Sequence, residues 1–195
     1  MTKKKEITAI ILAGGKSSRM LQDKGLVYLN DKMMIEYVIE KVKRVTSQII
    51  IITQNPQYNK LGYCCFKDRF KDKGPLAGIY TGLIHSYTQK NLVLGCDTPF
   101  ISENILQELI NNSRKEDVLI TEHEGKKEPL FAVYDKTCIP HFHARLKQGN
   151  LKITDALQGL KTAVINFDNK NWISDNEFAN INTPEELKQF KITKK

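Results

Sequence analysis

The feature that most constrains this chain is a short apolar run that ends abruptly at two glycines. Residues 9–13 are all apolar, and Gly14 and Gly15 follow them directly. A strand that is buried on both faces and ends at the rim of a parallel sheet has this pattern. The run therefore predicts a central strand whose carboxyl end opens into a glycine-rich loop.

The loop after this strand has the composition of an anion-binding loop. The glycines lack the Cβ atoms that would keep the backbone away from a phosphate, and Ser17, Arg19 and Lys24 add hydroxyl and cationic donors. Neither GxxxxGK[ST] nor GxGxxG is present, which disfavours a P-loop kinase and a dinucleotide oxidoreductase. We therefore expect phosphate at this loop, with a solvated strand exit as the alternative interpretation.

Length and composition favour one globular domain. The 195 residues suffice for one well-buried core and are short for two, and 41% hydrophobic with 27% charged residues is ordinary for a globular protein. No apolar run approaches the length of a membrane span. The basic start and the apolar run that follows it resemble a signal peptide, but the run is short and leads straight into the glycines. We interpret it as the first strand and expect a cytoplasmic protein.

The net charge and the cysteines exclude several other kinds of site. The formal net charge is +8, but the basic residues are spread along the chain instead of being concentrated on one predicted helix. This distribution favours attraction of polyanionic small molecules over nucleic acid, and we expect neither nucleic acid nor a membrane as a partner. The four cysteines have no CxxC spacing, so neither a disulfide framework nor a zinc site is expected.

Strand-like and helix-like segments alternate along the rest of the chain. Apolar runs predict strands at residues 48–53, 63–66, 91–97, 117–121, 129–134 and 163–167. Helical periodicity and start signals predict helices at residues 33–45, from 74, 103–112, 137–147, 154–160 and from 184, the last with a capping box over residues 183–186. This alternation predicts an α/β fold, a single Rossmann-like three-layer domain over residues 1–195 with a mostly parallel sheet and helices on both faces. Ligands of such sheets bind beyond the carboxyl ends of the strands.

A carboxylate at the end of another predicted strand is the second candidate functional group. Asp97 follows a hydrophobic run, Gly95 allows close approach of the backbone, and Pro99 turns the chain away. A carboxylate beside a phosphate loop suits Mg²⁺, which takes one or two carboxylates together with phosphate oxygens. The structural alternative is an Asx turn before Pro99.

These motifs together resemble a known enzyme family. Residues 12–24, LAGGKSSRMLQDK, resemble the signature loop of nucleotidyltransferases that join a nucleoside triphosphate to a small phosphorylated acceptor, and most closely that of the molybdenum cofactor guanylyltransferases. The one departure is Leu21, where that family usually has glycine. GPLAGI at residues 74–79, CDTPF at 96–100 and NINTPEEL at 180–187 match further motifs of the family in the right order.

The resemblance implies a reaction, a fold and partners. The reaction is transfer of GMP from GTP to the terminal phosphate of molybdopterin or the molybdenum cofactor, with release of pyrophosphate and with Mg²⁺ as cofactor. The fold is that of the nucleotide-diphospho-sugar transferases. The partners are GTP and molybdopterin or the molybdenum cofactor, and transient contact with other molybdenum cofactor proteins is left open.

The resemblance also implies roles for individual residues, with the N-terminal part binding the nucleotide and the C-terminal part the acceptor. The expected catalytic residues are Lys24, Arg19 and Asp97, and Asp97 is the expected Mg²⁺ ligand. The expected nucleotide-binding residues are Leu12, Ala13, Gly14, Gly15, Lys24, Asn55, Asp68 and Asp97. The expected acceptor-binding residues are Asn180, Asn182, Lys126 and Lys127.

Two other functions stay open from the sequence. A cytidylyl- or sugar-phosphate nucleotidyltransferase of the same fold would share the first loop and Asp97 but select another base or acceptor. A non-catalytic carrier of nucleotide or molybdopterin is the alternative from a different class. Leu21 is the feature that favours the carrier, whereas the presence of Lys24 and Asp97 argues against it.

Overall fold

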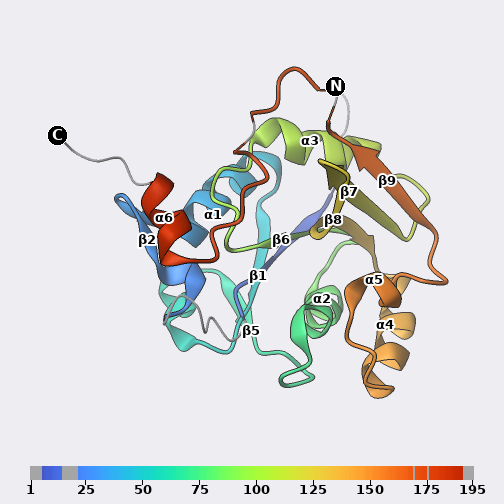
Figure 1. Cartoon of the computed structure of the whole chain (residues 1–195). Helices are drawn as coiled ribbons and strands as arrows, with labels where there is room; N and C mark the ends of the chain where they lie inside the picture. Colours follow the sequence, from blue (N-terminus) through green and yellow to red (C-terminus); the bar gives the residue numbers. More distant parts are fainter. Residues whose placement is uncertain (1–5, 15–21, 169, 175, 191–195) are drawn as a thin grey trace.

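The computed structural model describes residues 6–14, 22–168, 170–174 and 176–190. Within these residues the chain forms a seven-stranded sheet and a small two-stranded sheet, with helices on both faces of the large one (Figure 1). The strands of the large sheet, in their order across it, are β5 (Cys64–Phe66), β4 (Gln48–Ile52), β1 (Thr8–Leu12), β6 (Lys90–Gly95), β8 (Lys126–Asp135), β7 (Val118–His123) and β9 (Thr162–Asn166).

The sheet is mostly parallel, as the alternation of strands and helices predicted. Strands β5, β4, β1 and β6 run in the same direction, and β9 runs parallel to β7. Strand β8 is antiparallel to both of its neighbours, β6 and β7. The carboxyl ends of β4, β1 and β6 therefore meet at one edge of the sheet, and a ligand site is expected there.

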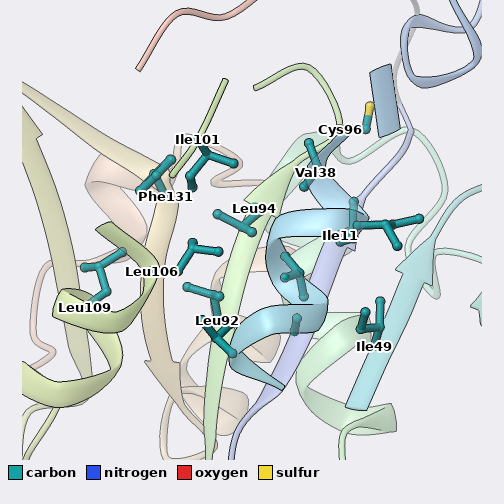
Figure 2. Close-up of a cluster of buried hydrophobic side chains, with 14 of the residues drawn as sticks. Ile11, Val38, Ile49, Leu92, Leu94, Cys96, Ile101, Leu106, Leu109 and Phe131 are labelled. Atoms are coloured by element: carbon teal, nitrogen blue, oxygen red, sulfur yellow. The ribbon is translucent and has the colours of Figure 1, made fainter. Parts of the chain in front are cut away.

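The helices cover the sheet in two layers, each with its own hydrophobic core. On one face lie α1 (Met34–Val45) and α3 (Glu103–Asn112), whose apolar stripes pack on the sheet (Figure 2). On the other face lie α2 (Gly74–His85), α4 (Cys138–Lys147) and the short α5 (Ile153–Ala156). No helix in the described part of the chain is both long and apolar enough to span a membrane.

Strand β1 is central because each of its faces supplies one of these cores. Ala9 and Ile11 pack with α1 on one face, and Ile10 and Leu12 pack with α2 on the other. All five residues of β1 are buried. Its continuous apolar sequence, rather than an alternating one, follows from burial on both faces.

Two elements differ from their predicted bounds by more than two residues. Strand β8 begins at Lys126, three residues before the predicted start, because β7 and β8 form a hairpin through the Glu124–Gly125 turn, where both residues have positive φ. Its register against β7 shifts between Ile120 and Thr121, where residues 129–131 of β8 have no paired residue on β7. Pro129, which cannot donate to a ladder, therefore lies within the bulge. The predicted helix at residues 154–160 is a single turn, Ile153–Ala156.

A third, smaller core joins the end of the chain to the first loop. The hairpin of β2 (Tyr28–Leu29) and β3 (Lys32–Met33) follows the one-turn 3₁₀ helix η1 (Lys24–Leu26). Val27 and Leu29 pack there with Ile181 and with Leu187 of α6 (Pro184–Phe190). The NINTPEEL segment is therefore held beside the exit of the glycine loop.

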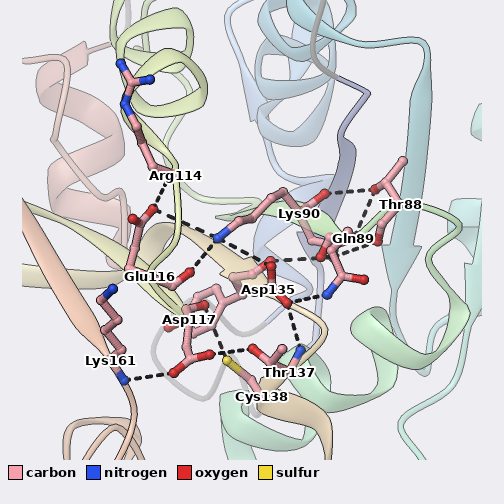
Figure 3. Close-up of polar contacts among 12 residues, drawn as sticks. Thr88, Gln89, Lys90, Arg114, Glu116, Asp117, Asp135, Thr137, Cys138 and Lys161 are labelled. Atoms are coloured by element: carbon pink, nitrogen blue, oxygen red, sulfur yellow. Dashed lines mark hydrogen bonds and ion pairs between the residues drawn. The ribbon is translucent and has the colours of Figure 1, made fainter.

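The opposite edge of the sheet carries a group of paired charges, here called the opposite-edge network (Figure 3). The Lys90 ammonium lies 3.4 Å from Asp135 Oδ2 and donates to the Glu116 carbonyl oxygen at 2.5 Å. Asp117 accepts from Thr137 Oγ1 at 2.5 Å and from the Lys161 amide at 2.8 Å. Lys90 begins the six-residue strand β6, and Asp97 follows the other end of that strand. The network and the end of β6 that carries Asp97 are therefore separated by roughly 20 Å.

Candidate active site

The carboxyl ends of the parallel strands bring distant motifs together. Leu12 at the end of β1 is paired with Ile52 of β4 and with Gly95 of β6. Two further backbone bonds extend this ladder, from the Ala13 amide to the Ile52 carbonyl at 2.9 Å and from the Cys96 amide to the Leu12 carbonyl at 3.1 Å. The start of the glycine loop and Asp97 are thereby placed side by side, although they are more than eighty residues apart in the sequence.

Lys24, Asp97 and Asn182 form the charged centre of this edge. The Lys24 Nζ lies 3.4 Å from Asp97 Oδ2 and donates to Asn182 Oδ1 at 2.5 Å. The Lys24 and Asp97 side chains are 26% and 21% exposed, so both are partly withdrawn from water yet can still be reached by a ligand. An ammonium group and a carboxylate at this spacing provide one cationic and one anionic contact for a bound phosphate ester and its counter-ion.

The C-terminal segment reaches this centre through hydrogen bonds of its backbone. The Ile181 amide donates to the Asp97 carbonyl oxygen at 3.0 Å, and the Ile181 side chain is fully buried. The Asn182 amide donates to Glu186 Oε2 at 2.6 Å, which fixes the residue that accepts from Lys24. The predicted capping box is confirmed, since the Glu186 amide donates to Thr183 Oγ1 at 3.1 Å and the Thr183 amide donates to Glu186 Oε2 at 3.2 Å.

Two cavities meet at Lys24 and Asp97. Cavity A has a volume of about 610 Å³ and extends from the end of β1 to the start of α2. Cavity B has a volume of about 430 Å³ and lies between β8 and the C-terminal segment. Both are lined by Lys24, Gly95, Asp97 and Leu130. A molecule in each cavity would therefore contact the same ammonium group and the same carboxylate.

Cavity A contains most of the predicted nucleotide-binding residues that the structure describes. Leu12, Gly14 and Asp68 line it, together with Gly74 and Pro75 at the start of α2. The Asp68 carboxyl is half-buried, and its buried Oδ1 has no hydrogen-bond partner among the described residues. Desolvation raises the pKa of Asp68 to about 6. A buried carboxyl oxygen without a partner, facing a cavity, is suited to accept from a ligand donor.

Gly14 lines cavity A, and the described residues leave space in front of it. A Cβ atom added there would come no closer to another described residue than 3.8 Å, at the Ile52 carbonyl oxygen. The described residues therefore do not require glycine at this position, and the missing Cβ leaves cavity A wider at the end of β1.

Cavity B contains the predicted acceptor-binding residues. Lys126, Lys127, Asn180 and Asn182 all line it. The Lys126 side chain is 71% exposed and its Nζ lies 2.6 Å from Glu128 Oε1. Phe131 and Phe178 also line this cavity, and their ring centroids are 5.3 Å apart. These two aromatic rings were not predicted as site residues, because Phe178 lies in a stretch without helical or strand periodicity.

Asn55 and Ala13 differ from the other described residues that were predicted to bind the nucleotide, because neither lines a cavity. Ala13 is fully buried directly after β1, and Gln54, the neighbour of Asn55, lines cavity A. The Asn55 side chain accepts from the Gln57 amide at 3.0 Å and donates to Asp23 Oδ2 at 3.1 Å. Its predicted contact with the nucleoside stays a prediction, whereas its contact with Asp23 is present in the structure. Of the other predicted site residues, Gly15 and Arg19 lie outside the described residues.

This arrangement defines a class of protein: a nucleotidyltransferase-type α/β sheet with a glycine-ended β1 and a Lys–Asp pair where two cavities join. The chain belongs to the MobA-like NTP transferase family, whose domain model matches residues 9–162. The resemblance inferred from the sequence motifs is thus confirmed.

Relatives of known name support the same family over nearly the whole chain. A Flavobacterium johnsoniae protein named "Probable molybdenum cofactor guanylyltransferase" is 39% identical over 188 residues, covering 95% of this chain and 97% of its own. The molybdenum cofactor guanylyltransferase of Vibrio parahaemolyticus is 38% identical over 186 residues, covering 93% of both chains. The crystal structure of molybdopterin-guanine dinucleotide biosynthesis protein A from Archaeoglobus fulgidus superposes with a TM-score of 0.79 at 28% identity, covering 95% of this chain and 97% of that one.

Proposed function

We propose that this protein transfers GMP from GTP to the terminal phosphate of molybdopterin or the molybdenum cofactor and releases pyrophosphate. The observation that carries the proposal is the Lys24–Asp97 pair, at 3.4 Å, where cavities A and B meet. The names of the relatives support a guanine nucleotide and the molybdenum cofactor as the two substrates.

In the proposed assignment, cavity A binds GTP and cavity B binds the acceptor. The backbone of Leu12, Ala13 and Gly14 and the Asp68 carboxyl contact the nucleotide. Asn180, Asn182, Lys126 and Lys127 contact the acceptor. GTP and the acceptor then both present their phosphates toward Lys24, which lines both cavities.

The reaction needs positioning and charge neutralisation more than it needs a base. A terminal phosphate oxygen of the acceptor forms a bond to the α-phosphorus of GTP, and the bond from that phosphorus to the bridging oxygen of the leaving pyrophosphate breaks. A phosphate nucleophile is already ionised at neutral pH, so no protein group has to remove a proton. The Lys24 ammonium is fixed by Asp97 and Asn182, so it is prepared to stabilise the negative charge of the phosphates.

Asp97 fits the requirements of a Mg²⁺ ligand. It supplies one half-buried carboxylate at a strand end, and the described residues contain no group of three or more His, Cys, Asp or Glu side chains that would form a metal cage. Mg²⁺ commonly takes one or two carboxylates together with phosphate oxygens and water, so a single carboxylate beside a triphosphate suffices. When bound, Mg²⁺ would neutralise charge on the phosphates during transfer.

The decisive experiment identifies the product. Purified protein is incubated with Mg²⁺, molybdopterin and each of the four nucleoside triphosphates, and the dinucleotide is identified by mass. We expect the guanine dinucleotide, and in a competition of equal GTP and CTP we expect GTP to be preferred by at least about two orders of magnitude in kcat/KM, because the wrong base leaves buried polar groups unpaired. A product mixture rich in the cytosine dinucleotide would contradict the base assignment. A product that forms equally well with Asp97→Asn would contradict the metal assignment.

A further inference from the structure

The residues around Asp23 and Gly25 suggest how Lys24 is held in place. Asp23 is half-buried and both of its carboxylate oxygens accept hydrogen bonds. The Tyr58 hydroxyl donates to Oδ1, and Asn55 Nδ2 donates to Oδ2 at 3.1 Å. Both partners come from the segment after β4, more than thirty residues away in the sequence, so they link the end of the glycine loop to a separate part of the fold.

Tyr58 is suited to act as a fixed donor. It belongs to the 3₁₀ helix η2 (Pro56–Leu61) and is fully buried in the core beneath α1. Burial, together with the neighbouring Cys96 and Asp23, raises the pKa of Tyr58 well above its ordinary value, so its hydroxyl keeps its proton at every working pH. Because the ring is packed on all sides, the hydroxyl has little freedom to follow Asp23 if that residue moves.

Gly25 fixes the other side of Lys24. A Cβ atom added at Gly25 would overlap the Tyr58 hydroxyl and would lie 3.1 Å from Cys96 Cβ and Sγ. The backbone after Lys24 is therefore wedged between Tyr58 and Cys96, the residue before Asp97. Asp23 and Gly25 are both held by Tyr58, and Lys24 between them reaches Asp97 and Asn182.

We propose that Tyr58 and Asn55 are positioning residues that clamp Asp23 and thereby hold the Lys24 ammonium at the junction of the two cavities. This inference rests on the proposed function, in which Lys24 contacts the transferred nucleotide. It gives Asn55 a role through Asp23 rather than by direct contact with the nucleoside. It also accounts for a buried tyrosine that lines neither cavity but whose hydroxyl donates to Asp23, which lines cavity A.

Two substitutions test the hydrogen bonds from Tyr58 and Asn55 to Asp23, here called the clamp, separately from other roles of Tyr58 and Asn55. Tyr58→Phe keeps the ring in the core and removes only the donor to Asp23. Asn55→Asp keeps an oxygen that can accept from the Gln57 amide at the start of η2, but it places a second carboxylate opposite Asp23. Tyr37→Phe is the matched control, because Tyr37 donates to the Leu29 carbonyl oxygen at 2.8 Å and lines neither cavity.

The first readout does not depend on nucleotide. The rate at which an amine-acylating reagent modifies Lys24 is measured by mass spectrometry, with the exposed Lys126 and Lys152 as internal references. We expect severalfold faster modification of Lys24 in Tyr58→Phe and Asn55→Asp, and no change in Tyr37→Phe. An unchanged rate in both clamp variants would overturn the inference whether or not the proposed function is correct.

The second readout is a pair of double-mutant cycles with Lys24→Ala. In the presence of Lys24, we expect each clamp substitution to lower kcat by about tenfold, because a small displacement of a positioned group is costly. In the Lys24→Ala background, we expect the same substitutions to change kcat and calorimetric GTP affinity by less than about twofold. An equal loss in both backgrounds would show that the residues act independently of Lys24. An Asn55→Asp loss that persists without Lys24 and alters base preference would identify Asn55 as a direct nucleoside contact.

Failure of the proposed function gives a different pattern. If wild-type protein forms no dinucleotide, or if Lys24→Ala forms it as fast as wild type, the assigned reaction or the role of Lys24 in it is wrong. Faster acylation of Lys24 in the clamp variants would still establish that Tyr58 and Asn55 hold the ammonium group.

Discussion

Asp68 shows how the environment of one residue prepares a binding site at the expense of stability. Its carboxyl lines cavity A, and one oxygen is buried without a hydrogen-bond partner among the described residues. Desolvation raises its pKa from the ordinary 3.8 to about 6, so the folded protein binds the proton more tightly than the unfolded chain does. The stability of the protein consequently falls as the pH rises from about 4 to about 6, and the cost remains at higher pH.

Replacing this carboxyl by an amide should therefore stabilise the protein. We expect Asp68→Asn to raise the free energy of unfolding by about 1 kcal/mol at about pH 7.5, less than the full pKa shift would give because solvent screens part of the group. The gain should disappear near pH 4, where the wild-type carboxyl is protonated in both states. Urea unfolding at the two pH values measures the difference. A gain of the same size at both pH values would show that ionisation of Asp68 is not its cause.

The sequence predicted individual site residues that belong to a recognisable local motif. It did not predict residues whose role depends on a contact with a distant part of the chain. Lys24 and Asp97 follow a glycine loop and a strand end, and those patterns can be read within ten residues. The link from Asp23 to Tyr58 joins positions 35 residues apart. It depends on how Tyr58 packs into the core that also contains residues of α1, and spacing along the chain contains no information on that packing.

Helix α6 helps to fix Asn182, which contacts Lys24 at the centre of the site. Its N-terminal Glu186 accepts from the amides of Asn182 and Thr183 at 2.6 and 3.2 Å. Leu187 anchors the same helix in the core that also contains Val27 and Leu29. The capping box thus fixes the Asn182 side chain that accepts from Lys24, in addition to starting the helix.

Loss of the capping carboxylate should affect both stability and the acceptor. We expect Glu186→Ala to lower the free energy of unfolding by about 1 kcal/mol, as for other lost caps, and to raise the KM for molybdopterin more than the KM for GTP. Glu185→Ala is the matched control, since the exposed Glu185 lies in the same first turn and has the same charge but is not part of the capping box. Equal effects of the two substitutions would indicate that only charge at the helix end matters. The measurements are thermal unfolding and initial rates at varied substrate concentrations.

Helices and buried strands were predicted from the sequence to within a few residues, and β8 shows why the exceptions occur. Local sequence argued against a strand over residues 126–129, because two lysines and a proline are unfavourable in an ordinary ladder. The hairpin with β7 and the bulge of β8 that contains Pro129 overcome that preference. Lys126 and Lys127 are thereby carried on a strand beside cavity B instead of on a solvated turn.

In the whole molecule, the candidate active site and the opposite-edge network lie at the two opposite edges of the large sheet. At the glycine-side edge, Lys24 and Asp97 line both cavities. At the other edge, the opposite-edge network closes the starts of β6 and β7 and the end of β8 (Figure 3). Burial acts to raise the pKa of Glu116, but the hydrogen bond from the Arg114 amide and the cations of Lys90 and Lys161 outweigh it and hold that pKa below its ordinary value.

Lys90 is the cation on which this network depends, and its removal should destabilise the fold without impairing catalysis. The Lys90 side chain is 20% exposed, while those of Glu116 and Asp135 are each 10% exposed. We expect Lys90→Met to lower the free energy of unfolding by about 2–3 kcal/mol near pH 7.5, because two largely buried carboxylates lose their cation. The kcat should stay within about twofold of wild type, because the site lies roughly 20 Å away along β6.

The pH dependence provides the sharper test of Lys90. The depressed pKa of Glu116 contributes stability that is present above the unfolded pKa and is lost as the pH falls through the folded value. The difference between wild type and Lys90→Met should therefore be largest above about pH 5.5 and should narrow below about pH 4, where the carboxylates become protonated. Lys32→Met is the control, because Lys32 pairs with Glu40 where the side chains are 39% and 52% exposed, and we expect no measurable change in stability. Urea unfolding across this pH range would contradict the role of Lys90 if the two lysine variants behaved alike, or if the loss in Lys90→Met did not depend on pH.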